Sequence, residues 1–316
     1  MRGPIAWSLE LGTVGLLKAG SASLPLLARL PANTKIYLPA LPTDPPSAIE
    51  EALGLIKQHD LEPIPHIAAS REESISSLEK RLAAWQRASK DRVREVLVVR
   101  GDPRAHHGTE STATASTSNT GAAFGTSLEL LESNVLQRCG IEAVSLCGHP
   151  EGIAAANLSA EAAQKHLKAK LQWADASGVR ARVVTQFCFD TATATGYVDT
   201  LRADGLDVAV SIGLVGPDVS MDRRKKMAER CGVRPPENGF VTPSLRRLAR
   251  WQAERGELAG AQMLHLYPFG GLRKCLAKMH DFTNDDSVEK DGTPYANFAM
   301  MPPVPDAFAS GDVPAP

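Results

Sequence analysis

The clearest candidate for acid–base chemistry is Glu10, near the end of the β-rich segment IAWSLEL at residues 5–11. Alternation along a strand places Trp7 and Leu9 on one side and Ser8 and Glu10 on the other. The bulkier side suits contact with helices, so we expect Glu10 to point into the interior, near the carboxyl end of the strand. Burial disfavours a charged carboxylate and predicts a raised pKa, as a proton donor near neutral pH needs. The alternative is a structural ion pair with Arg or Lys.

Further polar residues lie where other apolar segments end. Arg100 and Gly101 close the segment EVLVVRG at 95–101 and Asp102 follows it, and Gly101 permits a close backbone approach. Gln186 interrupts the apolar segment VTQFCF, and a buried amide needs hydrogen-bond partners. These residues predict ligand contacts. The alternatives are a turn with a local Arg–Asp pair and a structural amide hydrogen bond.

Histidine and cysteine spacing gives no support for a metal site. His66 ends the segment EPIPHIA, and His149 follows EAVSLCG, but no H-x-x-x-H or H-E-x-x-H spacing occurs. The five cysteines are widely spaced and include no C-x-x-C pair, which favours a reducing compartment. We therefore expect no metal and a cytoplasmic protein.

Charge and motif content exclude several classes of function. The 35 Lys and Arg residues balance the 36 Asp and Glu residues, so no global field attracts nucleic acid or acidic lipid. No run of about 18 apolar residues is present that could cross a membrane. The glycine-rich dinucleotide fingerprint, the P-loop and the G-x-S-x-G hydrolase elbow are also absent. We expect a small-molecule substrate, and the oligomeric state stays open.

Eight β-rich segments alternate with stretches of helical period. The predicted strands are 5–11, 35–40, 62–68, 95–101, 142–148, 182–189, 207–214 and 261–269. The predicted helices are 22–29, 46–59, 72–89, 127–139, 160–176, 192–203, 220–230 and 244–256. Eight such units in a chain of 316 residues predict an α/β protein with a single-domain (β/α)8 TIM barrel, and a doubly wound open sheet is the alternative.

Two regions are expected to lie outside this barrel. Residues 104–123 are rich in Ser, Thr and Gly and predict a long low-complexity loop after the fourth strand, either a lid or a disordered insertion. The catalytic barrel is expected to span 1–283. Residues 284–316, with five prolines after Met300, predict a flexible tail.

Six short motifs occur in an order that resembles methylenetetrahydrofolate reductase. They are S-L-E, P-H, R-G-D-P, G-H-P-E-G, V-T-Q-F-C-F-D and L-H-L-Y, and together they cover roughly residues 5–280. The resemblance implies a (β/α)8 barrel whose FAD takes hydride from NADH or NADPH. The hydride then converts 5,10-methylenetetrahydrofolate to 5-methyltetrahydrofolate, a reaction of one-carbon metabolism and methionine biosynthesis. Tetrahydrofolate derivatives are thus the implied partners.

The resemblance also implies roles for individual residues. Glu10 corresponds to the acid that protonates the folate N10, Asp102 to a carboxylate beside flavin and pterin, and Gln186 to the residue that orients the pterin. Tyr267 corresponds to a tyrosine near the folate. The implied flavin-contacting residues are His66, Arg100, Gly101, Asp102, Phe124, Gly125, His149 and Lys170.

The chain departs from the family pattern mostly at flavin-contacting positions. Tyr37 replaces a threonine-rich strand end, and the segment after His149 lacks an aromatic residue and a second histidine. A flavin-independent form of the reaction is therefore an alternative. A pterin-dependent methyltransferase and a non-catalytic folate-binding paralogue are others. We expect a short form without the regulatory domain of larger relatives, because too few residues follow the last predicted barrel element to fold alone.

Overall fold

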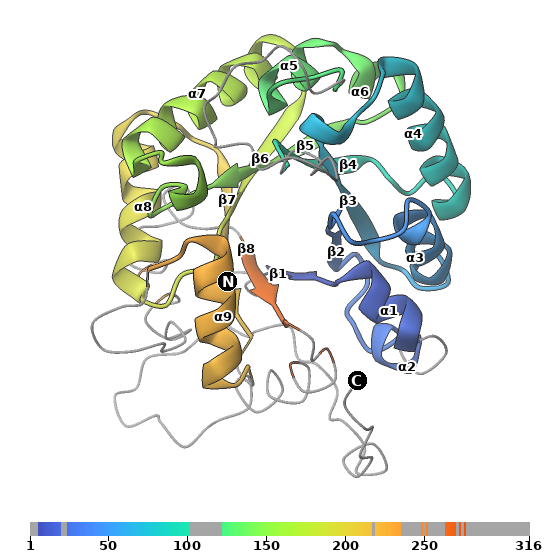
Figure 1. Ribbon diagram of the computed structural model, residues 1–316, viewed down its shortest axis with the longest axis horizontal. Coiled ribbons are helices and arrows are strands. Elements are labelled where there is room, and N and C mark those ends of the chain that lie inside the picture. Colours follow the sequence, from blue (N-terminus) through green and yellow to red (C-terminus); the bar gives the residue numbers. More distant parts are fainter. Residues whose placement is uncertain are drawn as a thin grey trace, which may run out of the picture.

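The computed structural model describes residues 6–19, 24–101, 122–216, 219–234, 248, 251, 263–269, 272 and 275. Eight parallel strands pair in chain order and close into a barrel, with β8 against β1 (Figure 1). They are β1 (Ala6–Glu10), β2 (Lys35–Leu38), β3 (Glu62–Ala68), β4 (Glu95–Val99), β5 (Ala143–Gly148), β6 (Arg180–Thr185), β7 (Ala209–Val215) and β8 (Met263–Tyr267). The predicted (β/α)8 barrel is confirmed, and the open sheet is excluded.

Helices connect the strands and surround the barrel (Figure 1). They are α1 (Thr13–Ala19), α2 (Leu24–Leu27), α3 (Ala48–Ile56), α4 (Ile75–Ser89), α5 (Ser127–Glu132), α6 (Val135–Arg138), α7 (Ala160–Ala176), α8 (Thr191–Ala203) and α9 (Met221–Cys231), with 3-10 turns at Ala69–Arg71 and Ala154–Ala156. Ser159 and Asp190 cap α7 and α8 by accepting hydrogen bonds from backbone N–H groups three residues further on. The prediction of one helix over 127–139 is wrong, because Asn134, with φ of +57°, separates α5 from α6.

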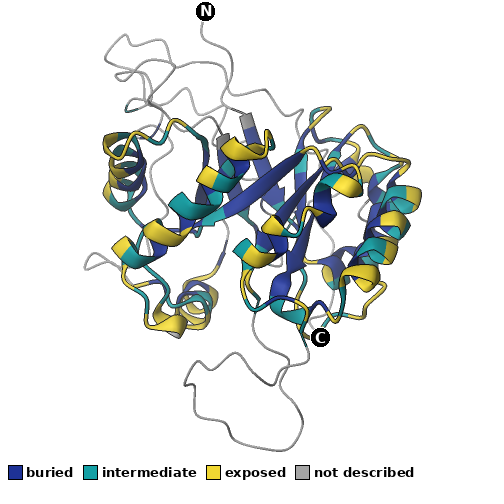
Figure 2. Ribbon diagram, turned by 90° about the horizontal axis from the view of Figure 1, so that it is seen from above, coloured by how far each residue is buried: buried dark blue, intermediate teal, exposed yellow. Residues whose placement is uncertain are grey.

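The core has one layer outside the strands and another inside the barrel. Buried side chains fill the space between strands and helices, whereas exposed residues lie on the outer helix faces (Figure 2). Inside the barrel, Tyr37, Ile64, Leu97 and Val184 form an apolar cluster. Inward-facing polar residues therefore belong to two groups, one at each end of the strands.

Several predicted segments lie outside the described residues. They are most of the 104–123 loop, the tail from 284 and the helix over 244–256 apart from Leu248 and Trp251. Among the described residues, no helix combines the length and the apolar character needed to span a membrane.

Candidate functional site

Glu10 lies at the carboxyl end of β1 and faces the barrel interior, as predicted. Its Oε2 atom lies 3.8 Å from Nε2 of His66 on β3 and 3.8 Å from Nε2 of His265 on β8. The Glu10 side chain is 22% exposed, and that of His265 is completely buried. In barrels of this kind catalytic groups gather at the carboxyl ends of the strands, so this cluster is the candidate active site.

The barrel closure positions His265 beside Glu10. Ser8 on β1 is paired in register with His265 on β8, and the Ser8 hydroxyl lies 2.9 Å from Nδ1 of that histidine. The edge of the imidazole meets the ring of Tyr37 at a centroid distance of 4.7 Å. Sequence analysis did not select Ser8 or His265, although strand alternation places them on the same inward faces as Glu10 and Tyr267.

The prediction of a raised pKa for Glu10 is wrong. Burial does raise the pKa of this carboxyl group, but the close approach of the His265 and His66 imidazoles lowers it by more. The pKa of Glu10 therefore lies below its ordinary value, and the ligand-free site holds a carboxylate at neutral pH.

His66 on β3 is the second histidine beside Glu10. Burial lowers the pKa of His66 to about 4. The Glu10 carboxylate raises this pKa, but desolvation and the nearby His265 together lower it by more. Its Nε2 atom is buried and forms no hydrogen bond with a described residue. This atom is directed at Glu10, whereas the sequence resemblance assigned His66 to flavin contact.

Gln186 and Tyr267 lie at the carboxyl ends of β6 and β8. The Gln186 side-chain carbonyl accepts a hydrogen bond from the Phe187 backbone N–H at 3.1 Å, which holds the amide in place. The Tyr267 hydroxyl donates to the carbonyl of Thr185 at 3.1 Å. The rings of Phe187 and Tyr267 pack edge to face at 5.6 Å. At this end of the barrel the Gln186 amide, held by its backbone hydrogen bond, lies near the packed rings of Phe187 and Tyr267. Such a combination suits a flat heterocycle.

The flavin positions carried over from the resemblance fall into different environments. Arg100 is exposed, and Gly101 has a φ of +77° at a point where a Cβ atom would lie 2.7 Å from Cβ of Ala68. Phe124 is 4% exposed and packs in the outer core. The Gly125 N–H donates to the Glu129 carboxylate at 2.8 Å. Phe124 and Gly125 are thus engaged within the protein, and Asp102 lies outside the described residues.

His149 follows the carboxyl end of β5, and Lys170 of α7 lies near both His149 and Cys147. Burial lowers the pKa of Lys170, and this amine forms no ion pair with an acidic residue of the described chain. Burial and the nearby Lys170 lower the pKa of His149 to about 4. A partly desolvated ammonium without a carboxylate partner fits an anionic ligand group, such as the phosphates of a dinucleotide.

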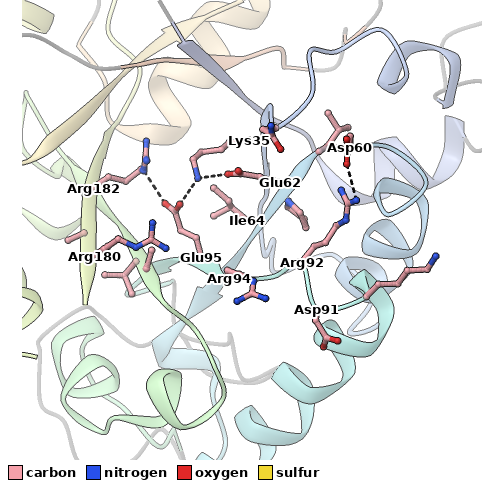
Figure 3. A pocket seen from close by; sticks show the side chains of 17 residues that line it. Lys35, Asp60, Glu62, Ile64, Asp91, Arg92, Arg94, Glu95, Arg180 and Arg182 are labelled. Atoms are coloured by element: carbon pink, nitrogen blue, oxygen red, sulfur yellow. Dashed lines mark hydrogen bonds and ion pairs between the residues drawn. The ribbon is translucent and has the colours of Figure 1, made fainter. Parts of the chain in front are cut away.

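A cavity of about 890 Å³ lies at the opposite, amino-terminal end of the strands (Figure 3). Lys35 donates at 2.7 Å to both Glu62 and Glu95, and Arg182 lies 3.2 Å from Glu95. The Ser145 hydroxyl also donates to Glu95, at 2.6 Å. Each of these charged side chains is paired with one of opposite charge, which indicates a structural role. Sequence analysis missed them, although charged residues at the starts of apolar strands were a usable signal.

The described residues contain no group of three His, Cys, Asp or Glu side chains that could hold a metal ion. Comparison with known protein families gives a match to the family described as methylenetetrahydrofolate reductase. Its model matches residues 45–242, which is more than half of the 316-residue chain.

Proposed function

The chain belongs to the methylenetetrahydrofolate reductase family, and from this premise we propose that it interconverts 5,10-methylenetetrahydrofolate and 5-methyltetrahydrofolate. NADH or NADPH is the proposed hydride donor. The observation that carries the proposal is the carboxylate of Glu10, which lies between two buried histidines at the carboxyl end of the barrel. A non-catalytic folate binder has no need of an ionisable group held in this way.

The proposed chemistry begins with proton transfer from Glu10 to N10 of the folate, which opens the five-membered ring. The resulting iminium carbon at N5 accepts hydride and becomes the methyl group. Because Glu10 is ionised in the ligand-free site, it must first take up a proton, and a bound pterin favours this by displacing water from the carboxylate. We assign Gln186 and Tyr267 to the pterin, together with Asp102, whose carboxylate would favour the cation.

FAD is the proposed cofactor, and when bound it supplies a flavin that accepts hydride from the nicotinamide and delivers it to the folate. Lys170, His149 and Arg100 are the described residues proposed to hold it. Direct hydride transfer from the nicotinamide is a second candidate, because Phe124 and Gly125 are engaged in contacts within the protein.

The visible absorption spectrum distinguishes the two routes. The purified protein is measured before and after addition of FAD, and then with methyltetrahydrofolate under anaerobic conditions. Flavin bands that bleach on folate addition support the flavin route. A colourless protein that does not bind FAD, but oxidises NADH or NADPH with methylenetetrahydrofolate, supports direct transfer.

The Glu10→Gln variant tests the acid. The amide cannot donate a proton in the same way, so turnover should fall by about 10²- to 10⁴-fold while folate binding is retained. Product formation is followed chromatographically, and the Kd for methyltetrahydrofolate by calorimetry. Wild-type turnover in this variant would refute the assignment. Methyl transfer to an acceptor without nicotinamide would favour a methyltransferase, and folate binding without turnover under any reductant would favour a binding paralogue.

A further inference from the structure

We propose that Thr185 and Gly213 are positioning residues at the carboxyl end of β6: together they hold a one-residue bulge that determines where the Gln186 amide lies. The part that Gln186 plays in folate binding rests on the proposed function. The bulge itself is a property of the protein without ligand, so the two can be tested separately.

The first observation is one extra residue where β6 ends. Val184 on β6 pairs with Ser211 on β7. The next pairing between these two segments joins Cys188 to Leu214. Three residues therefore separate the two pairings on the side of β6, whereas two residues separate them on β7. A strand that gains one residue against its neighbour forms a bulge, and bulges next to active sites redirect side chains.

The burial pattern changes at the same point. Val183 and Cys188 both belong to the core cluster outside the barrel, although they are five positions apart. In an uninterrupted strand, residues an odd number of positions apart lie on opposite faces. The extra residue thus reverses the alternation. It brings Phe187 and Phe189 into the aromatic cluster that packs against Tyr267.

The second observation is that the Thr185 hydroxyl replaces a backbone acceptor. The Gly213 N–H donates to Oγ1 of Thr185 at 2.8 Å, and Thr185 is 2% exposed. In an unbroken parallel ladder this N–H would donate to a backbone carbonyl of the neighbouring strand. The Thr185 carbonyl accepts instead from the Tyr267 hydroxyl at 3.1 Å. Thr185 therefore holds β7 with its side chain and a proposed ligand contact with its backbone.

The third observation is that a side chain opposite the bulge has no room. A Cβ atom at Gly213 would overlap the carbonyl oxygen of Thr185 and would lie 2.9 Å from the carbonyl carbon of Gln186. Both are backbone atoms, so neither can rotate away. The Gly213 carbonyl then accepts from the Cys188 N–H at 3.3 Å, where the pairing resumes. Glycine thus permits the close crossing that the bulge requires.

Gln186 lies within the bulge and is held at two atoms. Its backbone N–H donates to the carbonyl of Gly148 on β5 at 2.8 Å. Its side-chain carbonyl accepts from the Phe187 N–H, which belongs to the same bulge. A change in the path of the chain between Thr185 and Cys188 therefore moves the amide.

The first test examines the bulge without ligand, by hydrogen exchange in protein labelled with ¹⁵N-glycine. Thr185→Val keeps the shape of the side chain but removes the acceptor, so protection of the Gly213 amide should fall by about tenfold. Thr185→Ser retains the hydroxyl and should restore most of this protection. The amide of Gly54 in α3 is the internal control and should exchange as in the wild type.

The second test measures the Kd for 5-methyltetrahydrofolate by calorimetry. Thr185→Val should raise this Kd by about tenfold and Gly213→Ala should raise it further, because each displaces the Gln186 amide. Thr185→Ser should stay within about threefold of the wild type. The matched control is Gly196→Ala on α8, where a Cβ atom meets no other atom within 4 Å. It should leave the Kd unchanged.

A mutant cycle separates positioning from a general loss of structure. If Thr185 acts through the residues that it holds, Thr185→Val should change the Kd by less than about twofold in protein that already carries Gln186→Ala and Tyr267→Phe. The same tenfold change in both backgrounds would overturn the proposal, because the effect would then not pass through these side chains.

The remaining outcomes distinguish the bulge from the proposed function. If protection of Gly213 falls as expected but the wild-type protein binds no methyltetrahydrofolate, the proposed function fails and the bulge stands. If folate binding is normal and Thr185→Val does not change the Kd, the positioning role fails alone. Thr185→Val carries the test should Gly213→Ala fail to fold. A Gly213 amide that exchanges as fast as a free amide in the wild-type protein would overturn the proposal without any variant.

Discussion

At the scale of single residues, two histidines at the catalytic end couple folding to pH. His66 and His149 each have a pKa lowered from 6.5 to about 4, mainly because burial disfavours the charged ring. Between these values the unfolded chain binds protons that the folded protein does not bind. Their contribution to stability is therefore complete above pH 6.5 and is lost as the pH falls towards 4.

We predict that the free energy of unfolding decreases on acidification from about pH 7.5 to about pH 4.5, and that His149→Gln makes this decrease smaller. The expected effect follows because glutamine does not titrate in this range. Urea unfolding followed by circular dichroism at several pH values provides the measurement. An unchanged pH dependence in His149→Gln would show that this ring is not desolvated in solution.

The sequence predicted the place of Glu10 but not its protonation. Strand alternation was enough to turn this side chain inward. The direction of its pKa shift depends on His66 and His265, which lie on strands far apart in the sequence and meet only when the barrel closes. The apolar–polar pattern along one strand does not show which side chains of distant strands lie beside it.

At the scale of elements, the starts of four strands form a charged layer beneath the apolar interior. Lys35 begins β2, Glu62 begins β3, Glu95 begins β4, and Arg182 lies near the start of β6 (Figure 3). The Glu95 side chain is 9% exposed, whereas that of Glu62 is 47% exposed, although both contact the same lysine. The two carboxylates therefore provide a matched pair that differs in burial.

We predict that Glu95→Gln destabilises the fold by about 3 kcal/mol, since it leaves Arg182 and Lys35 without their buried counter-charge. Glu62→Gln should cost less than about 1 kcal/mol. Burial raises the pKa of Glu95, but Arg182 and Lys35 lower it by more, to below its ordinary value of 4.5. This stabilisation is thus present above pH 4.5 and is lost as the pH falls through the lowered pKa. Urea titrations of both variants supply the free energies, and equal losses would show that burial does not set the cost.

Elements were predicted well where the pattern was long and regular. The helix over 160–176 matches α7 at both ends, and all eight strands were located. The helix α1 (Thr13–Ala19) was missed, because only 22–29 was predicted as the first helix. Two further errors fall where backbone geometry overrides periodicity. Asn134 separates α5 from α6, and β6 ends at Thr185 although the apolar run continues to Phe189. Phe187 and Phe189 leave the strand and pack against each other in an aromatic cluster.

At the scale of the whole molecule, Tyr37 lies between the catalytic cluster and the charged layer. Its ring contacts His265, and its hydroxyl lies 2.9 Å from that of Ser145, which in turn donates to Glu95. Hydrogen bonds therefore link Tyr37 to Glu95 through Ser145, whereas Tyr37 reaches the Glu10 cluster only through its ring contact with His265. Because no hydrogen bond crosses that contact, we expect the two ends to be energetically independent.

A double-mutant cycle of Glu10→Gln and Glu95→Gln tests this independence. The two losses in unfolding free energy should add to within about 0.5 kcal/mol, as is usual for sites without shared partners. Removing the Tyr37 hydroxyl by Tyr37→Phe should cost about 1 kcal/mol and leave that sum unchanged. A coupling energy above about 1 kcal/mol that disappears in Tyr37→Phe would mean that one polar network spans the barrel. In that case a stabilising change at the amino end would also alter the protonation of Glu10, and the two ends could not be engineered separately.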